Sequence, residues 1–336
     1  MDDATLHEAG ELEALRRFLP LLPAGDATAL GPGDDAAVVA APDGRFVVTT
    51  DTMLEGADFR LGWSRWHDLG WKAVATNLID VAAMGARPTS LVVALAVPPS
   101  TRVAALEEFA RGLADAIAAM APGVGVVGGD LGTARHGVIA VTAFGDLEGR
   151  APVLRSGANA GDAVWLVGAL GLAATGLRHL FAAAVDEAAE PVRDAAERLR
   201  RGAHGASIDA QLAPVTPIGA GALLADLGAT AMLDVSDGLA LDAARVARAS
   251  GVRIALEATG VALAAPGASL EAALHGGEDH ALLVTIPADV APPPELDGHP
   301  VRRIGVVEAP AADEGGTVTL DGEPLEARGW DPYRAG

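Results

Sequence analysis

Apolar and polar residues follow one another in patterns that predict both helices and strands in the first half of the chain. A helical period over residues 7–19 ends at two prolines, and another over 69–84 ends before Gly85 and Pro88. Short strands are expected at 36–41 and 46–50, with Asp51 at the end of the second. Apolar runs at 91–97, 124–127 and 138–147 predict further strands, and residues 102–120 predict a helix.

The second half has a similar mixture. Strands are expected near 163–167, 232–235, 252–256, 281–286 and 301–307, with helices up to about residue 201 and from Gly238 through about Ser250. A chain of 336 residues suits two domains, and the turn signal at 148–150 predicts the boundary between them. We therefore expect an α/β or α+β architecture in two domains, 1–149 and 150–336.

Composition narrows the possible functions. The formal charge is -21, which disfavours nucleic acid and anionic membranes as partners. The chain has no cysteine, and this excludes disulfides, thiolate zinc sites and cysteine nucleophiles. No apolar run approaches the roughly 20 residues of a membrane span. We expect a cytoplasmic protein.

Acidic residues beside glycines, or at the ends of predicted strands, recur at six places. Carboxylates on tight turns are typical ligands of hard cations such as Mg²⁺, which in turn bind phosphates. Any one of these segments could be an ordinary turn, but together they would repel one another if they converged without metal ions. The segments are 33–35, 49–51, 77–80, 128–130, 234–238 and 276–279.

Two common phosphate-transfer signatures are absent from the sequence. There is no Gly-x-x-x-x-Gly-Lys-Ser/Thr loop, and the only lysine, Lys72, lies in a predicted helix. The His-Arg-Asp signature of protein kinases is also missing. The eight histidines show no metal-ligand spacing and are interpreted as structural or surface residues. Mg²⁺, backbone N–H groups and arginine would therefore have to neutralise bound phosphate.

The segment Asp234-Val235-Ser236-Asp237-Gly238 is the most informative single motif. A predicted strand delivers Asp234, Ser236 offers a hydroxyl group, and Asp237 lies before a helix whose free N–H groups favour anions. A helix N-cap would explain one of these three residues, but not all of them.

The ordered motifs resemble those of the thiamine-monophosphate kinase family, which is related to aminoimidazole ribonucleotide synthetase. They are Gly-Asp-Asp, Thr-Thr-Asp-Thr, Asn-Leu-Ile-Asp-Val-Ala-Ala-Met-Gly-Ala, Gly-Gly-Asp, Arg-Ser-Gly-Ala, Asp-Val-Ser-Asp-Gly-Leu and Gly-Gly-Glu-Asp, and the match runs from about Glu11 to Tyr333. The resemblance implies ATP-dependent phosphorylation of thiamine monophosphate to thiamine diphosphate. It also implies a homodimer in which the N-terminal sheets of two subunits form a barrel, with a C-terminal α/β domain completing the active site.

The resemblance also implies roles for individual residues. Metal ligands fall on Asp35, Thr49, Thr50, Asp51, Asp80, Asp130, Asp234 and Asp237, and we expect Asp51, Asp80, Asp130 and Asp237 to act in catalysis. Nucleotide contacts fall on Gly129, Asp130, Arg155 and Ser236, and substrate contacts on Glu278 and Trp330. Asp58 stands where many family members have histidine, and we place it in the substrate site as well.

The expected reaction is direct in-line transfer assisted by several Mg²⁺ ions, without a phosphoenzyme. Two alternatives stay open. The chain could be another ATP-dependent synthetase of the same superfamily, or a non-catalytic protein that binds metal or nucleotide on the same fold.

Overall fold

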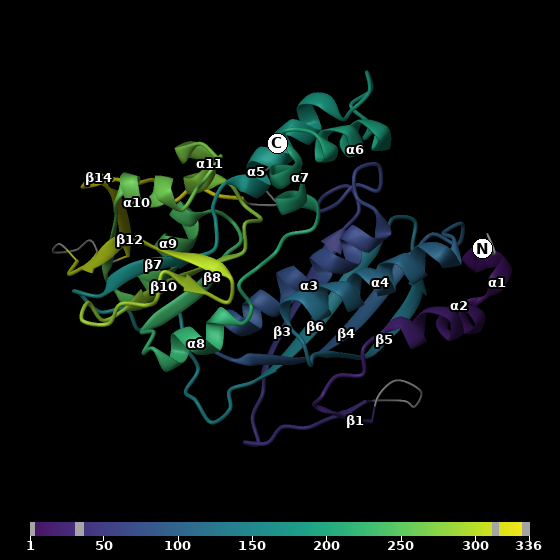
Figure 1. Ribbon diagram of the computed structural model, residues 1–336, viewed down its shortest axis with the longest axis horizontal. Helices are drawn as coiled ribbons and strands as arrows, with labels where there is room; N and C mark the ends of the chain where they lie inside the picture. The colour runs from purple at the N-terminus through teal and green to yellow at the C-terminus, as the bar shows by residue number, and fades with distance from the viewer. Residues whose placement is uncertain (1–3, 31–36, 311–315, 331–336) are drawn as a thin grey trace.

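The N-terminal half is a four-stranded sheet with two long helices on one face (Figure 1). The computed structural model describes residues 4–30, 37–310 and 316–330. The strand order is β3-β6-β4-β5, with β3 Val47–Leu54, β6 Val138–Asp146, β4 Arg87–Val97 and β5 Gly125–Thr133. Helices α3 (Trp66–Ala83) and α4 (Val103–Met120) confirm the two helices predicted from the apolar period.

Two glycines let α3 and α4 pack closely. A Cβ atom on Gly70 would lie 2.1 Å from the carbonyl oxygen of Phe109, and one on Gly112 would lie 2.0 Å from that of His67. Any side chain at either position would force the helices apart. This contact fixes α3, which carries the predicted metal ligand Asp80.

The segment before this sheet forms short elements. They are α1 (Leu6–Ala9), α2 (Glu11–Phe18), the 3₁₀ helix η1 (Leu19–Leu21), and the two-stranded sheet of β1 (Thr28–Leu30) and β2 (Val38–Val39). The helix predicted over 7–19 is therefore two helices. Gly10 separates them because it has a φ of 75°, a value that ends α1 and precedes α2.

The C-terminal half contains an eight-stranded sheet of order β14-β13-β9-β12-β7-β10-β8, with β11 paired to β12. Its pairs are antiparallel except β13 with β9. The bounds are β7 Ala163–Val167, β8 Ala231–Val235, β9 Arg253–Leu256, β10 Ala281–Ile286, β11 Glu295–Leu296, β12 His299–Glu308, β13 Thr317–Leu320 and β14 Glu323–Pro324. The five strands predicted in this half are confirmed.

Helices of the C-terminal half form two groups. Helices α5 (Leu172–Ala183), α6 (Arg193–Arg201) and α7 (Gly205–Leu212) pack together and reach toward the N-terminal half (Figure 1). The others are α8 (Ala220–Asp226), α9 (Leu239–Ser250), α10 (Ala258–Leu263) and α11 (Leu270–His275). None of the described helices is long and apolar enough to cross a membrane.

The two halves share a hydrophobic core. Ile79 of α3 and Leu91 of β4 belong to the same buried cluster as Met232 of β8 and Leu282 of β10. Helix α3 contacts both β8 and α8. It therefore lies at the junction of the two halves, and groups on its surface meet groups from both.

Two aspartates predicted at strand ends lie inside longer strands in the structure. Asp51 lies inside β3 rather than at its end, and Asp130 lies inside β5, which continues through Gly128 and Gly129 to Thr133. Pairing with β4 extends β5 through the two glycines, from Val92↔Gly128 to Val97↔Thr133. Hydrogen bonding to a neighbouring strand has thus overridden the local turn preference of a Gly-Gly pair.

Candidate active site at the domain junction

Three predicted metal ligands of the N-terminal half come together between β3 and α3. Thr49 Oγ1 donates a hydrogen bond to Asp80 Oδ2 at 3.2 Å. Asp51 is two residues beyond Thr49 on β3, so its side chain leaves the same face of the sheet. The structure therefore brings Thr49, Asp51 and Asp80 to one place.

The pKa of Asp80 is strongly shifted. Burial raises its pKa to about 7, and the charges of Asp234 and Asp51 act in the same direction, opposed by His280 and by the hydrogen bond from Thr49. Its carboxyl group thus responds to carboxylates from both halves of the protein. Such mutual repulsion is what a bound cation would relieve.

Asp234 enters from the C-terminal sheet. It is buried at the end of β8, and its Oδ2 lies 3.2 Å from Nδ1 of the equally buried His280. Burial lowers the pKa of His280, but the bond to Asp234 and the charges of Asp234 and Glu278 outweigh it, so the pKa lies above its ordinary value. The interpretation of the histidines as structural or surface residues includes His280, which is a buried histidine held by Asp234.

Asp237 is held by an arginine. Arg245 Nη2 lies 2.6 Å from Asp237 Oδ2, and Nη1 donates to Asp242 Oδ1 at 2.5 Å. Asp242 also accepts from the backbone N–H groups of Asp237 and Gly238, at 3.1 and 3.2 Å. The sequence predicts that N–H groups before α9 favour a bound anion. In the structure, the carboxylate of Asp242 accepts from them instead.

Asp130 lies apart from the other carboxylates. Across the sheet, Asp130 of β5 pairs with Ala94 of β4, Ala94 pairs with Ala140 of β6, and Ala140 pairs with Thr52 of β3. Paired residues point to the same face of a sheet, and Thr52 points to the face opposite to its neighbour Asp51. The side chain of Asp130 therefore lies on the face opposite to that of Asp51. Strands β3 and β5 are separated by β6 and β4, three spacings or about 14 Å. Within one subunit, Asp130 and Asp51 cannot bind the same ion.

Other predicted residues take varied positions. Thr50 Oγ1 donates to the carbonyl oxygen of Val141 at 2.9 Å, on the sheet face opposite to Thr49. Arg155 is exposed in the segment that joins the halves, and Ser236 accepts the backbone N–H of Glu278 at 2.7 Å through its carbonyl oxygen. Gly129 lies beside Asp130 in β5. Asp34 and Asp35 lie outside the described residues.

A cavity of about 410 Å³ brings the predicted substrate residues together. Its walls come from the loop after β3, from α3, from α5 and α7, and from the C-terminal segments around residues 277–278 and 330. Asp58, Glu278 and Trp330 all line it. The cavity is of the size that small-molecule sites commonly have.

The single lysine faces this cavity. Lys72 is buried in α3, its Nζ forms an ion pair with Glu278 Oε2, and it also donates to the carbonyl oxygen of Gln211 at 3.3 Å. Burial pushes the pKa of Glu278 upward, but the charges of Lys72 and His280 outweigh this and keep the pKa below its ordinary value. Helical folding therefore turns Lys72 toward a residue of an acidic motif that is 206 positions away in the sequence.

Asp58 and Trp330 line the cavity and also take part in hydrogen bonds with the backbone of neighbouring segments. Asp58 Oδ2 accepts the backbone N–H of Leu54 at 2.7 Å, and burial followed by the charge of Glu278 raises its pKa. The backbone N–H of Trp330 donates to the carbonyl oxygen of Asp237 at 2.8 Å, which ties the C-terminal segment to the site. Asp279, the neighbour of Glu278, instead accepts the N–H groups of Gly171 and Ala173 at the start of α5.

The oxygen donors fit Mg²⁺ bound together with phosphate better than a preformed protein cage. Among the described residues, no three His, Asp or Glu side chains lie close enough together to hold an ion by themselves. Mg²⁺ is commonly held by one or two carboxylates plus water and substrate phosphates. The pair Asp80 and Asp51, with Asp234 nearby, offers that kind of incomplete shell.

Several residues of the site were not predicted from the sequence. One of them is Lys72, which lies eight residues before the predicted ligand Asp80 on the same side of α3, a spacing that can be read from the sequence. Arg245 is similarly placed, three residues after Asp242. Gln211, Trp63 and Phe181 line the cavity but have no local signal, because the packing of α5–α7 against the N-terminal half brings them there.

Known proteins resemble this chain over most of its length. Residues 33–147 match the family of the AIR synthase related protein, N-terminal domain, and residues 159–315 match its C-terminal domain. The chain is 41% identical to the thiamine-monophosphate kinase of Mycobacterium tuberculosis, over 99% of this chain and 94% of that protein.

Two solved structures are similar throughout. The thiamine-monophosphate kinase of Stenotrophomonas maltophilia superposes with a TM-score of 0.71 and 31% identity, covering 89% of this chain and 93% of that one. AaThiL complexed with AMPPCP and TMP superposes with a TM-score of 0.70 and 29% identity, covering 98% and 99%. The chain therefore shares both its fold and much of its sequence with these proteins.

Proposed function

The chain belongs to the thiamine-monophosphate kinase family, and we propose that it transfers the γ-phosphoryl group of ATP directly to thiamine monophosphate at the junction of its two halves. The activity is the ATP-dependent formation of thiamine diphosphate. One observation carries the proposal of this location: helix α3 places Lys72 in the wall of the cavity that contains Asp58, Glu278 and Trp330, and Asp80 eight residues further along the same helix.

The acceptor phosphate does not need a general base. A phosphate monoester has a second pKa of about 6 and is largely ionised at neutral pH. The barrier is instead the repulsion between an anionic acceptor and the phosphates of ATP. Catalysis would therefore rest on positioning and charge neutralisation, without a phosphoenzyme.

The positions of Lys72 and Asp80 on α3 indicate how the substrate is oriented in the site. They are eight residues apart on one face of α3, which corresponds to about 12 Å along the helix axis. Lys72 lines the cavity, whereas Asp80 lies with the carboxylates. We assign the ring system of the substrate to the cavity and its phosphate to the Asp80 end, with Glu278 near the cationic thiazolium ring and Trp330 against an aromatic face.

Mg²⁺ would be held by Asp80 and Asp51 with Thr49, and by Asp234 from the other half. When bound, it would neutralise the phosphate oxygens and bring the donor and acceptor phosphates together. Asp237 would leave Arg245 to join this set, and Arg155 and Ser236 would orient the nucleotide. Asp130 and Gly129, about 14 Å away, would serve a separate ion and the nucleotide. Thr50 and Asp35 complete the proposed ligands.

The uncovered face of the N-terminal sheet supports a homodimer. Phe46 and Val48 are exposed by 58% and 53%, and a second cavity of about 280 Å³ on this face is lined mainly by apolar side chains. Large exposed apolar surfaces mark interaction sites. We propose that two such sheets pack face to face into a barrel. The family matches end at 147 and resume at 159, which supports division into 1–149 and 150–336.

A turnover assay tests the proposed function. With Mg²⁺ and ATP, the protein should release ADP and form thiamine diphosphate only when thiamine monophosphate is added, and unphosphorylated thiamine should not replace it. ADP release that is independent of thiamine monophosphate would overturn the proposal. Binding of ATP without any turnover would favour a nucleotide-binding protein instead.

A further inference from the structure

The cavity loop, residues 60–64, forms part of the wall of the substrate cavity. Its members Arg60, Trp63 and Ser64 line the cavity. The loop lies between β3 and α3 in the sequence, so it belongs to the N-terminal half of the chain. Its side chains and carbonyl groups, however, contact helices of the C-terminal half. The wall of the cavity therefore depends on contacts between the two halves.

Trp63 inserts into the core of these helices. It is only 5% exposed and belongs to the same buried cluster as Leu180 of α5 and Ile208 of α7. Its Nε1 donates to the carbonyl oxygen of Ala184, just after α5, at 2.7 Å. The indole ring also meets Phe181 of α5 edge to face, with ring centroids 4.9 Å apart. The chain around Trp63 is thus built into the C-terminal half.

Arg60 is carried by the same loop and lies against rings from both halves. Its guanidinium carbon is 5.2 Å from the ring centroid of Trp63 and 5.0 Å from that of Phe181. Arg60, Trp63 and Phe181 all line the cavity. A cation over aromatic faces is stabilised only while the rings keep their places. This part of the wall is therefore sensitive to the position of the cavity loop relative to α5.

Gly62 lets the cavity loop approach the segment before α6. A Cβ atom at this position would lie 2.4 Å from Cβ and 2.7 Å from the carbonyl oxygen of Pro191. The φ of Gly62 lies outside the left-handed region, so the lack of space, rather than backbone strain, excludes a side chain there. The close contact with Pro191 requires glycine.

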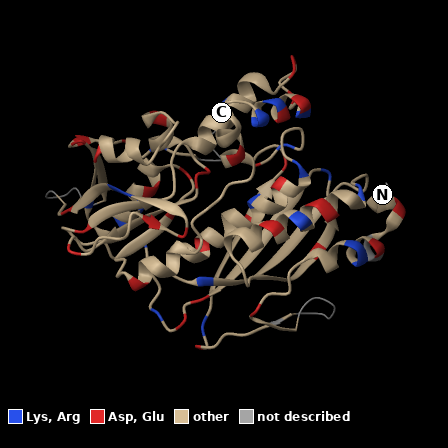
Figure 2. Ribbon diagram, viewed as in Figure 1, with Lys and Arg blue, Asp and Glu red and all other residues tan. Residues whose placement is uncertain are grey.

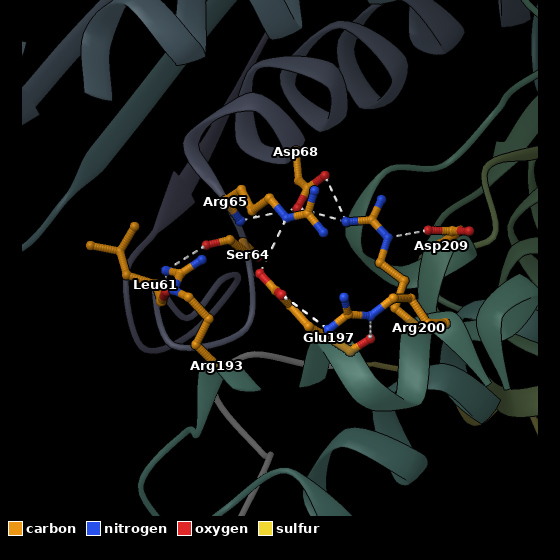
Figure 3. A network of polar contacts seen from close by, with 9 residues as sticks. Leu61, Ser64, Arg65, Asp68, Arg193, Glu197, Arg200 and Asp209 are labelled. Carbon is orange, nitrogen blue, oxygen red and sulfur yellow. Dashed lines mark hydrogen bonds and ion pairs between the residues drawn. The ribbon is translucent and has the colours of Figure 1, made fainter. Parts of the chain in front are cut away.

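Helix α6 faces this stretch of chain with a polar stripe. Arg193, Glu197 and Arg200 are spaced by four and three residues, which places them on one face of the helix. Figure 3 shows the three side chains directed toward the chain segment of residues 61–68. In the middle of the stripe, Glu197 Oε1 lies 3.8 Å from Arg65 Nε. The stripe contacts the N-terminal half along its whole length.

Arg200, at one end of the stripe, links α3 to α7. Its Nη1 donates to both carboxylate oxygens of Asp68 at 2.9 Å, and its Nε donates to Asp209 Oδ1 at 2.5 Å (Figure 3). Asp68 lies in the first turn of α3, and Asp209 lies on α7. Helix α6 is thereby fixed relative to two helices that line the cavity.

Arg193, at the other end of the stripe, holds the cavity loop. Its Nη2 donates to the backbone carbonyl oxygen of Leu61, and to that of Ser64 at 3.3 Å (Figure 3). One charged group therefore joins both ends of the turn that carries Trp63. Hydrogen bonds from a charged donor are stronger than those between neutral groups.

We propose that Arg193 is a positioning residue for thiamine monophosphate. Arg193 is not one of the described residues that line the cavity. It acts by holding the cavity loop, so that Arg60 and Trp63 keep their places in the wall. The inference rests on the proposed function, since it concerns the same substrate and the same cavity.

This role predicts an effect on one substrate and not on the other. The residues proposed to contact the nucleotide do not line this cavity; they are Gly129, Asp130, Arg155 and Ser236. A displaced cavity loop should therefore weaken the binding of thiamine monophosphate and leave ATP binding unchanged. A variant that loosened the whole protein would weaken both.

The test compares the full-length protein with its Arg193→Met and Arg193→Lys variants. Calorimetry measures Kd for thiamine monophosphate and for a non-hydrolysable ATP analogue, and steady-state kinetics measure kcat and both KM values. R193M should raise Kd and KM for thiamine monophosphate about tenfold, the scale of one hydrogen bond to a charged group, while kcat and the nucleotide values change by less than about twofold. R193K keeps a charged donor, and the carbonyl acceptors do not require a guanidinium fork, so it should restore most of the affinity.

Gly62→Ala tests the same contact from the loop side. Its methyl group would push the cavity loop away from Pro191, so G62A should also raise KM for thiamine monophosphate and leave KM for ATP unchanged. Arg201→Met is the matched control, because Arg201 lies on the same helix with a side chain 74% exposed and pairs with Glu197 within α6. R201M should leave the affinity for both substrates unchanged.

Unchanged affinity for thiamine monophosphate in R193M and G62A would overturn the role of Arg193. An equal loss of affinity for the nucleotide would overturn it as well. A wild type that neither binds nor turns over thiamine monophosphate would contradict the proposed function, and this inference with it. The two failures are distinguishable, because the role of Arg193 alone is contradicted only when the wild type is active.

Discussion

Lys72 Nζ in α3 forms an ion pair with Glu278 Oε2, which belongs to the C-terminal half. The lysine side chain is 4% exposed and the glutamate side chain 38%. Glu278 has a φ of 72°, an uncommon value for a residue with a side chain, so the backbone of the 276–279 segment is shaped to present this carboxylate. The pair connects the two halves at the wall of the substrate cavity.

Glu278→Gln should lower the free energy of unfolding by about 3 kcal/mol, because it leaves the buried ammonium group of Lys72 without an opposite charge. Urea unfolding of the metal-free protein measures this. The double variant K72M/E278Q should recover most of the stability but not the activity. Equal loss in the single and double variants would show that the charge pair is not the cause.

Asp80→Asn should reduce kcat by about 10³-fold or more, the scale of losing a group that stabilises transition-state charge. The fold should persist, and without divalent cations the variant should melt at a higher temperature than wild type, because repulsion from Asp234 and Asp51 is removed. Thermal melting in EDTA together with steady-state kinetics checks both. Near-normal turnover in D80N would contradict the proposed role of Asp80 in binding Mg²⁺. Asp51→Asn should also reduce kcat, and near-normal turnover in D51N would contradict the same role for Asp51.

Asp279 gives a pH dependence of stability. Burial raises its pKa from 3.8 to about 7, against the N–H groups of Gly171 and Ala173. A carboxyl group whose pKa is higher in the folded state stabilises the fold when protonated, and that contribution is lost as pH rises from about 4 to 7. The loss is at most about 4 kcal/mol. Asp279→Asn should therefore show a smaller loss of stability between pH 4 and pH 8 than wild type in urea unfolding. Identical pH profiles of stability in D279N and wild type would contradict this contribution of Asp279.

Arg200→Met should lower the free energy of unfolding by about 3 kcal/mol, because Asp68, with a side chain only 4% exposed, loses its partner. The neighbouring Arg201 is a matched control: its side chain is 74% exposed and pairs with Glu197 within α6. Basic and acidic groups alternate on this helix (Figure 2). R201M should change stability by less than about 0.5 kcal/mol. Comparable losses in R200M and R201M would contradict the link between α3 and α7.

Val48→Asp should convert a dimer into monomers, because it places a charge among the exposed apolar residues at the start of β3, next to Phe46. Sedimentation velocity measures the change. Leu263→Asp is the control, since Leu263 is 70% exposed on α10 in the other half and should leave the association state unchanged. A wild type that sediments as a monomer would contradict the proposed barrel.

Much of the fold was predictable because its signals are local. The apolar period over 69–84 predicted α3 within three residues, and the runs at 163–167 and 281–286 predicted β7 and β10 with the bounds that the structure has. Strand ends depend on pairing with neighbouring strands. Asp51 and Asp130 looked like ends because of their neighbours, but pairing with β6 and β4 carries both strands past them.

The sequence by itself determined the family, the order of the elements and the oxygen-rich chemistry of the site, because side-chain period and motif order are written along the chain. Only the tertiary structure decided which groups meet. It set Asp80 beside Asp234, moved Asp130 to the opposite face of the sheet, paired Lys72 with Glu278, and placed Gln211 in the cavity wall. These relationships depend on the packing of α3 against both halves and on strand register, which fix distances between residues far apart in sequence and leave no local pattern.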